Sequence, residues 1–128
     1  MVGGLFLKMI LNWGKTRTAL WLAGSTTTPP SYFMLGSGSG TTIATQVELL
    51  HPWDRQENTS INGSTAYKVK YTGDWNSIEM SGNQLREWGM CLNEATTTGS
   101  MWSRTAMPNA ITFDGTTELR IEETWEVF

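Results

Sequence analysis

Hydrophobic and polar residues alternate most regularly in the last eleven positions of the chain, ELRIEETWEVF. The apolar positions of this pattern are Leu119, Ile121, Trp125 and Val127. A period of two predicts a half-buried β-strand whose other parity, with Glu118, Glu122 and Glu126, faces solvent. Glu123 alone breaks the pattern, because its parity places it among the apolar residues. We therefore expect Glu123 to be paired, to sit on a bulge or to lie in an interface.

Further short segments upstream also favour strands. They are SYFML (31–35), AYKVKYTGDW (66–75), NSIEMSG (76–82), REWGMCLNE (86–94) and SMWSRTAM (100–107). Turn residues separate them at spacings typical of antiparallel sandwiches, and Asn62-Gly63 is the dipeptide that best fits a type I′ hairpin turn. The pattern predicts an all-β protein, an antiparallel β-sandwich of about six or seven strands.

The first half of the chain is less regular. Leu5, Phe6, Met9, Ile10 and Trp13 recur at three- and four-residue steps, which predicts a short N-terminal helix within residues 1–14 that ends at Gly14. ALWLA (19–23) favours a strand or a tight connector, and GSGSGTT (36–42) a loop. TQVELLHPW (45–53) fits either one helical turn or an edge strand, closed by Pro52.

Length and composition restrict the class of protein. The 128 residues (14.3 kDa) fit a single domain, 1–128, with the helical segment at its start. A net charge of -3 and a pI near 5.0 leave no basic stripe for phosphates, so we expect no nucleic-acid partner. The apolar N-terminus is too short to span a bilayer and lacks a clear export pattern, which favours a protein made in the cytoplasm with no membrane partner.

Candidate catalytic groups are few. His51, the single histidine, precedes a proline with no acid placed as a relay, and the single Cys91 lies among apolar residues of a predicted strand, where a buried thiol is the ordinary outcome. Gly36–Gly40 lacks the spacing of the known phosphate-binding loops. No Cys/His spacing could hold zinc, and the C-terminal glutamates are spaced as on any solvated strand. We expect no enzyme, cofactor or metal.

The seven tryptophans are the most unusual feature of the composition. General burial tendencies place four or five of them in the core. The others are candidates for contacts with another chain or with a sugar ring, because tryptophan is enriched at interfaces. The interface candidates are Trp13, Trp53, Trp75, Trp102, Glu123, Trp125 and Phe128.

The C-terminal third, REWGMCLNEATTTGSMWSRTAMPNAITFDGTTELRIEETWEVF, resembles small virion structural proteins of tailed bacteriophages. The matching positions are Glu87, Gly89, Asn93, Gly99, Met101, Arg104, Leu119, Ile121, Trp125, Val127 and Phe128. YFMLGSGSGTT is similar to the opening of the same proteins, and the similarity departs after Gly40. In a strand, Gly89 is expected to permit close backbone approach or a bulge. Arg104 is expected to reach a carboxylate or a carbonyl.

The resemblance implies a non-enzymatic virion protein that binds the capsid, neck or tail in many copies as a decoration or accessory subunit. Its partners would be other virion proteins and further copies of itself, and its location the virion after synthesis in the host cytoplasm. The alternative is a carbohydrate-binding receptor-recognition module of a tail fibre, with two or three coplanar exposed tryptophans beside Asn or Asp. A small glycosidase is disfavoured, because no convincing acid pair is present.

Overall fold

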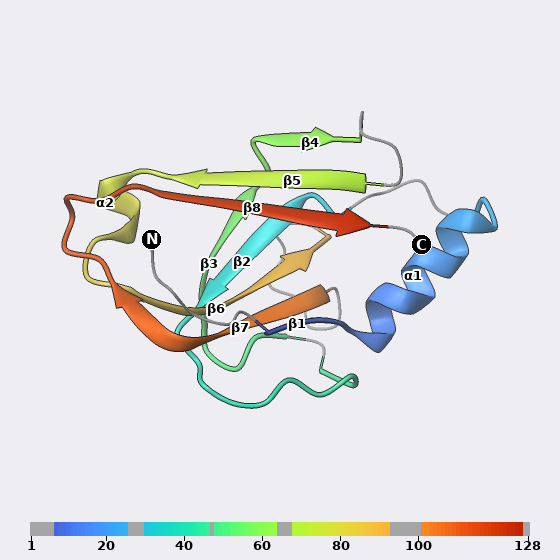
Figure 1. The fold of residues 1–128 in the computed structure, drawn as a ribbon, viewed down its shortest axis with the longest axis horizontal. Helices are drawn as coiled ribbons and strands as arrows, with labels where there is room; N and C mark the ends of the chain where they lie inside the picture. The colour runs from blue at the N-terminus through green and yellow to red at the C-terminus, as the bar shows by residue number, and fades with distance from the viewer. Residues whose placement is uncertain (1–6, 26–29, 47, 64–67, 93–100, 127–128) are drawn as a thin grey trace.

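Two antiparallel sheets make up most of the protein, in a computed structural model that describes residues 7–25, 30–46, 48–63, 68–92 and 101–126. One sheet has the order β1 (Leu7–Ile10), β7 (Met101–Thr112), β6 (Gln84–Cys91), β2 (Tyr32–Gly36) and β3 (Pro52–Glu57). The other has the order β4 (Ser60–Asn62), β5 (Lys68–Trp75) and β8 (Leu119–Glu126). This sandwich-like arrangement confirms the all-β prediction (Figure 1).

Most strands lie where the alternation places them, but the described residues form eight strands and not six or seven. The strands that were not predicted are the short edge strands β1 and β4 and the strand β3. Pro52 was expected to end a segment, but it is the first residue of β3. Pro52 fits there because β3 is an edge strand, where a missing N–H is tolerated. The predicted turn after Asn62 extends outside the described residues, although β4 and β5 are antiparallel.

The predicted N-terminal helix is wrong. Residues Leu7–Ile10 form β1, which pairs with β7 from Leu7↔Ala106 to Ile10↔Ser103. The helix α1 begins only afterwards and spans Asn12–Leu22, so it includes Trp13, Gly14 and most of ALWLA. A short apolar run fits strand and helix alike, and here a distant strand edge decides between them. Leu5 and Phe6 lie outside the described residues.

NSIEMSG is also not a strand. Ser77–Met80 form α2, a single helical turn with a capping box. The Asn76 side chain accepts hydrogen bonds from the N–H groups of Ile78 and Glu79, and the Glu79 carboxylate accepts one from the Asn76 N–H. This Asn-x-x-Glu spacing is a helix-start signal that outweighs the apolar character of Ile78 and Met80. Figure 1 shows α1 and α2 at opposite ends of the molecule.

The main core lies between the two sheets. Its buried members from the five-stranded sheet include Phe33, Leu35 and Met90, and those from the three-stranded sheet are Tyr71, Trp75 and Ile121. A smaller cluster occupies the outer face of the five-stranded sheet, where Leu11 and Leu49 cover Met34, Cys91 and Met101. The strand β2 is therefore buried on both faces, which explains its continuous apolar run YFML.

A buried ion pair holds the glycine-rich segment on that outer face. Arg104 Nη2 lies 2.8 Å from Glu87 Oε2, and both side chains are fully buried. Glu87 also accepts hydrogen bonds from the N–H groups of Gly38, Leu50 and His51, at 3.2, 3.1 and 2.7 Å. The loop predicted from GSGSGTT thus wraps a carboxylate of the protein itself. Arg104 also donates to the Gly40 carbonyl, so its expected contacts are confirmed.

Helix α1 approaches β7 closely at Gly14. A Cβ added there would touch the Trp102 carbonyl oxygen and lie 2.7 Å from its ring carbon Cδ1. In an isolated helix, Gly14→Ala would add stability by propensity. Here we expect it to lower the free energy of unfolding by about 1 to 3 kcal/mol in urea titrations, because the helix must move. The control is Lys15→Ala at the exposed next position. A Gly14→Ala variant more stable than the native protein would contradict this close packing of α1 on Trp102.

Candidate functional site

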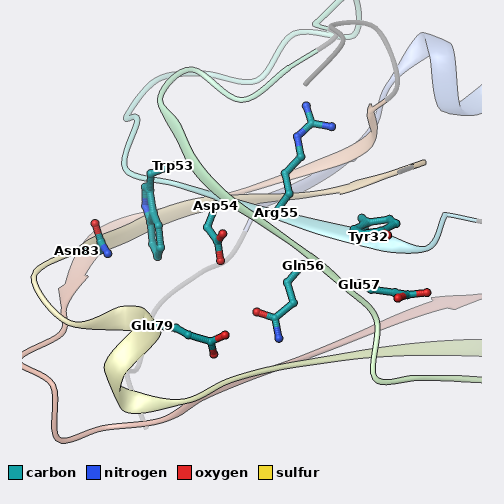
Figure 2. A pocket seen from close by; sticks show the side chains of 8 residues that line it. All are labelled: Tyr32, Trp53, Asp54, Arg55, Gln56, Glu57, Glu79 and Asn83. Carbon is teal, nitrogen blue, oxygen red and sulfur yellow. The ribbon is translucent and has the colours of Figure 1, made fainter. Parts of the chain in front are cut away.

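An open groove of about 500 Å³ runs along β3, the edge strand of the five-stranded sheet. Its lining comes from β2, β3, α2 and the turn before β6: Tyr32, Trp53, Asp54, Arg55, Gln56, Glu57, Glu79 and Asn83. Figure 2 shows the side chains of Asp54, Gln56 and Glu79 extending into the space between β3 and α2. Strand residues of both parities line the groove, so it follows the edge of the sheet and not one face.

A β-bulge directs Trp53 into this groove. Gly36 pairs with Pro52 and Leu35 with Asp54, which leaves Trp53 as the extra residue of β3. Its indole N–H donates to the Gln84 carbonyl at 2.9 Å, and its ring is half-buried against the main core. Trp53 is therefore fixed by β6 and lies beside Asn83 at one end of the groove (Figure 2).

Asp54 and Gln56 share the side of β3 that faces β5. The Trp75 indole N–H donates to Asp54 Oδ2 at 3.1 Å, and Gln56 Nε2 donates to the Asp74 carbonyl at 2.6 Å. Burial raises the pKa of the Asp54 carboxyl above its ordinary value, although the bond from Trp75 opposes the rise and the charge of Glu79 adds to it. Asp54 is thus a partly desolvated acid with a second acid nearby.

A second groove of about 510 Å³ adjoins the first, since Gln56 and Glu79 line both. It adds Asp74, Trp75, Asn76, Glu118, Leu119 and Arg120. Among the charged side chains of the two linings, five are acidic and two are basic. Both arginines have carboxylate neighbours, since Arg120 Nε lies 2.6 Å from Asp74 and Arg55 Nη2 lies 3.8 Å from Glu48. The combined surface is therefore acidic.

Several of the interface candidates named from the sequence come together inside the protein, where Trp13 and Trp125 pack against Trp102. Trp75 and Trp102 are 2% and 0% exposed, so they belong to the core and offer no surface to another chain in this conformation. Trp13 and Trp125 are half-buried beside Trp102, whereas Trp53 is half-buried in the groove along β3. Phe128 lies outside the described residues.

Glu123 is buried between the sheets and is held by four donors. The Trp88 indole and the Thr105 hydroxyl bond its Oε1 at 3.3 and 3.4 Å, and the Ser103 hydroxyl bonds Oε2 at 3.3 Å. The Trp125 indole N–H bonds Oε2 at 2.6 Å. The carboxylate that breaks the strand pattern is therefore paired within the protein, which is one of the three outcomes expected from the sequence. Burial, and then the charge of Glu123, raises the pKa of Tyr71 to about 12.

The other candidate groups have structural roles. Cys91 is fully buried as predicted, and burial raises the pKa of its thiol to about 11, which suppresses its reactivity. The side chain of His51 is exposed, and its backbone N–H donates a hydrogen bond to the Glu87 carboxylate. Among the described residues, no group of three His, Cys, Asp or Glu side chains could hold a metal ion. Within the same part of the chain, no helix has the length and apolar character needed to cross a membrane.

Apart from Trp53, sequence reasoning missed the residues of the groove, above all Asp54 and Glu79. One signal was available, since the spacing of Asn76 and Glu79 is that of a capping box and would have placed Glu79 at a helix start. Comparisons with known proteins yield no match, whether to a protein family, to a curated protein or to a solved structure. The similarity to phage virion proteins therefore stays a prediction.

Proposed function

We propose that the protein is a non-enzymatic structural subunit of a tailed-phage virion, which binds in many copies to the capsid, neck or tail. The observation that supports this best is the position of β8 at the edge of its sheet. All eight residues of β8 pair with β5, from Leu119↔Trp75 to Glu126↔Lys68. In the described part of the chain, no strand pairs with the opposite edge of β8.

An edge of this kind suits selective docking. The edge of β8 that no described strand covers can accept a strand of a neighbouring subunit. Ile121 and Glu123 anchor the inner face of β8, whereas Arg120, Glu122 and Glu126 are exposed. Exposed charges on an edge strand disfavour indiscriminate pairing, so only a complementary partner should add there.

The proposal predicts that the protein occurs in many copies in particles purified by density banding from a host that carries its gene, as measured by quantitative mass spectrometry. Glu122→Arg combined with Glu126→Arg should lower the copy number while changing the free energy of unfolding by less than about 0.5 kcal/mol at each site. Lys15→Glu, a charge reversal on the exposed face of α1, is the control. Particles without the protein would contradict the proposal.

The carbohydrate-binding alternative has less support. It requires two or three coplanar exposed tryptophans beside Asn or Asp. The groove along β3 has one tryptophan in its lining, Trp53, which lies beside Asn83 and Asp54. One tryptophan does not meet the requirement. Trp75 borders the adjoining groove but is buried.

A further inference from the structure

The groove along β3 and its neighbour beside α2 form a continuous acidic surface at the far edge of the five-stranded sheet. We propose that this surface binds an extended segment of a partner protein that carries lysine or arginine side chains and adds as a strand to β3. This surface meets β8 at its first residues, Leu119 and Arg120, and the inference does not depend on a virion role.

The backbone of β3 is available for such an addition. β3 pairs with β2 from Tyr32↔Glu57 to Gly36↔Pro52, and no strand within the described residues pairs with its other edge. Six residues of strand span roughly 20 Å, which matches an added segment of six to eight residues. Because the groove follows this edge, side chains of both parities of an added strand would meet its walls.

The side chains favour a basic segment. Arg55 and Arg120 already have the carboxylate neighbours Glu48 and Asp74. Within the described residues, no cationic side chain forms an ion pair with the four further carboxylates of the two linings: Asp54, Glu57, Glu79 and Glu118. A cation beside the partly buried Asp54 would offset the desolvation of its carboxylate. Trp53 and Tyr32 add aromatic rings against which a cationic side chain can pack.

Other ligand classes fit less well. No described cluster of His, Cys, Asp or Glu could hold a metal ion, so a divalent cation lacks a ligand set. A neutral sugar could donate hydroxyl hydrogen bonds to the carboxylates but would leave their charge uncompensated, and an anionic sugar would be repelled. An extended basic peptide uses the open strand edge, the acidic walls and the aromatic rings together.

The test uses the whole protein, labelled with ¹⁵N, and three capped eight-residue peptides. The first alternates lysine with threonine, the second replaces lysine with glutamate, and the third is the first with alternate backbone nitrogens methylated. We expect the lysine peptide to bind and to shift the amide signals of β3 and α2. The methylated peptide should bind about tenfold more weakly or worse, because it loses several backbone hydrogen bonds. The glutamate peptide should not bind.

Matched protein variants locate the site. Glu57→Gln with Glu118→Gln should weaken binding of the lysine peptide about two- to tenfold, as expected for two exposed charge contacts. Glu126→Gln, the same change on exposed β8, should leave the affinity unchanged. Shifts confined to β8, equal binding of the methylated peptide, or no binding of the lysine peptide would each overturn the inference. Absence of the protein from virions would overturn the proposed function alone.

Discussion

Glu87→Ala is expected to lower the free energy of unfolding by about 3 to 5 kcal/mol, the usual cost of breaking a buried ion pair from one side. The substitution leaves the guanidinium of Arg104 buried opposite an apolar methyl group. It also removes the acceptor of three backbone N–H groups, those of Gly38, Leu50 and His51. Urea denaturation followed by tryptophan fluorescence measures the loss, and Glu126→Ala on the exposed face of β8 is the control.

Two further variants separate the charge from the hydrogen bonds. Glu87→Gln keeps an acceptor for the backbone amides and should cost less than Glu87→Ala. Adding Arg104→Met to Glu87→Ala removes the buried cation that lacks its carboxylate partner, and it should recover part of the stability. Recovery should stay incomplete, because the amides of residues 38, 50 and 51 still lack their acceptor. A Glu87→Ala variant as stable as the native protein would show that the loop does not depend on this carboxylate.

Arg104 and Gly89 show how far the sequence alone can be interpreted. A lone cation in an apolar strand must find an acceptor, and Arg104 finds both kinds expected, the Glu87 carboxylate and the Gly40 carbonyl. Gly89 was expected to allow close backbone approach or a bulge, and an added Cβ there would lie 2.7 Å from the Ser103 carbonyl oxygen. Both predictions succeed because steric and desolvation costs act locally, whatever the partner.

The N-terminal prediction fails because its outcome depends on a distant strand. Leu7–Ile10 form backbone hydrogen bonds with the edge of β7, almost a hundred residues away. The periodicity of a four-residue segment contains no information about this distant partner. The same limit applies to Trp102. Cys91 pairs with Met101 and Met90 with Ser103, so Trp102 is the extra residue of a bulge, which alternation does not reveal.

The candidate groove was beyond prediction for a related reason. Its walls come from β2, from β3 with the bulge at Trp53, and from the α2 region, segments that are 20 to 50 residues apart. Each acid looks like an ordinary surface residue in the sequence. Only the pairing of β3 at the sheet edge, with Glu79 fixed at the start of α2, makes them neighbours.

Trp102→Ala is expected to cost about 3 to 5 kcal/mol of unfolding free energy, because a fully buried aromatic side chain is deleted from a packed site. Trp102 lies at the centre of an aromatic cluster. Its ring centroid is 5.2 Å from that of Trp13, 6.0 Å from that of Trp21 and 6.4 Å from that of Trp125. The deletion therefore removes the surface on which α1 is seated as well as part of the core between the sheets.

The position of the cluster predicts where the damage should concentrate. Trp102 supports α1 through Trp13 and Trp21 and through the bond from its indole N–H to the Thr18 hydroxyl at 3.3 Å. In native-state hydrogen exchange, the amides of α1 should lose protection in Trp102→Ala beyond the global loss of stability. Trp102→Phe keeps a ring and should cost less. If α1 and the β5–β8 pair lost protection equally, α1 would not depend on this side chain more than the rest of the fold does.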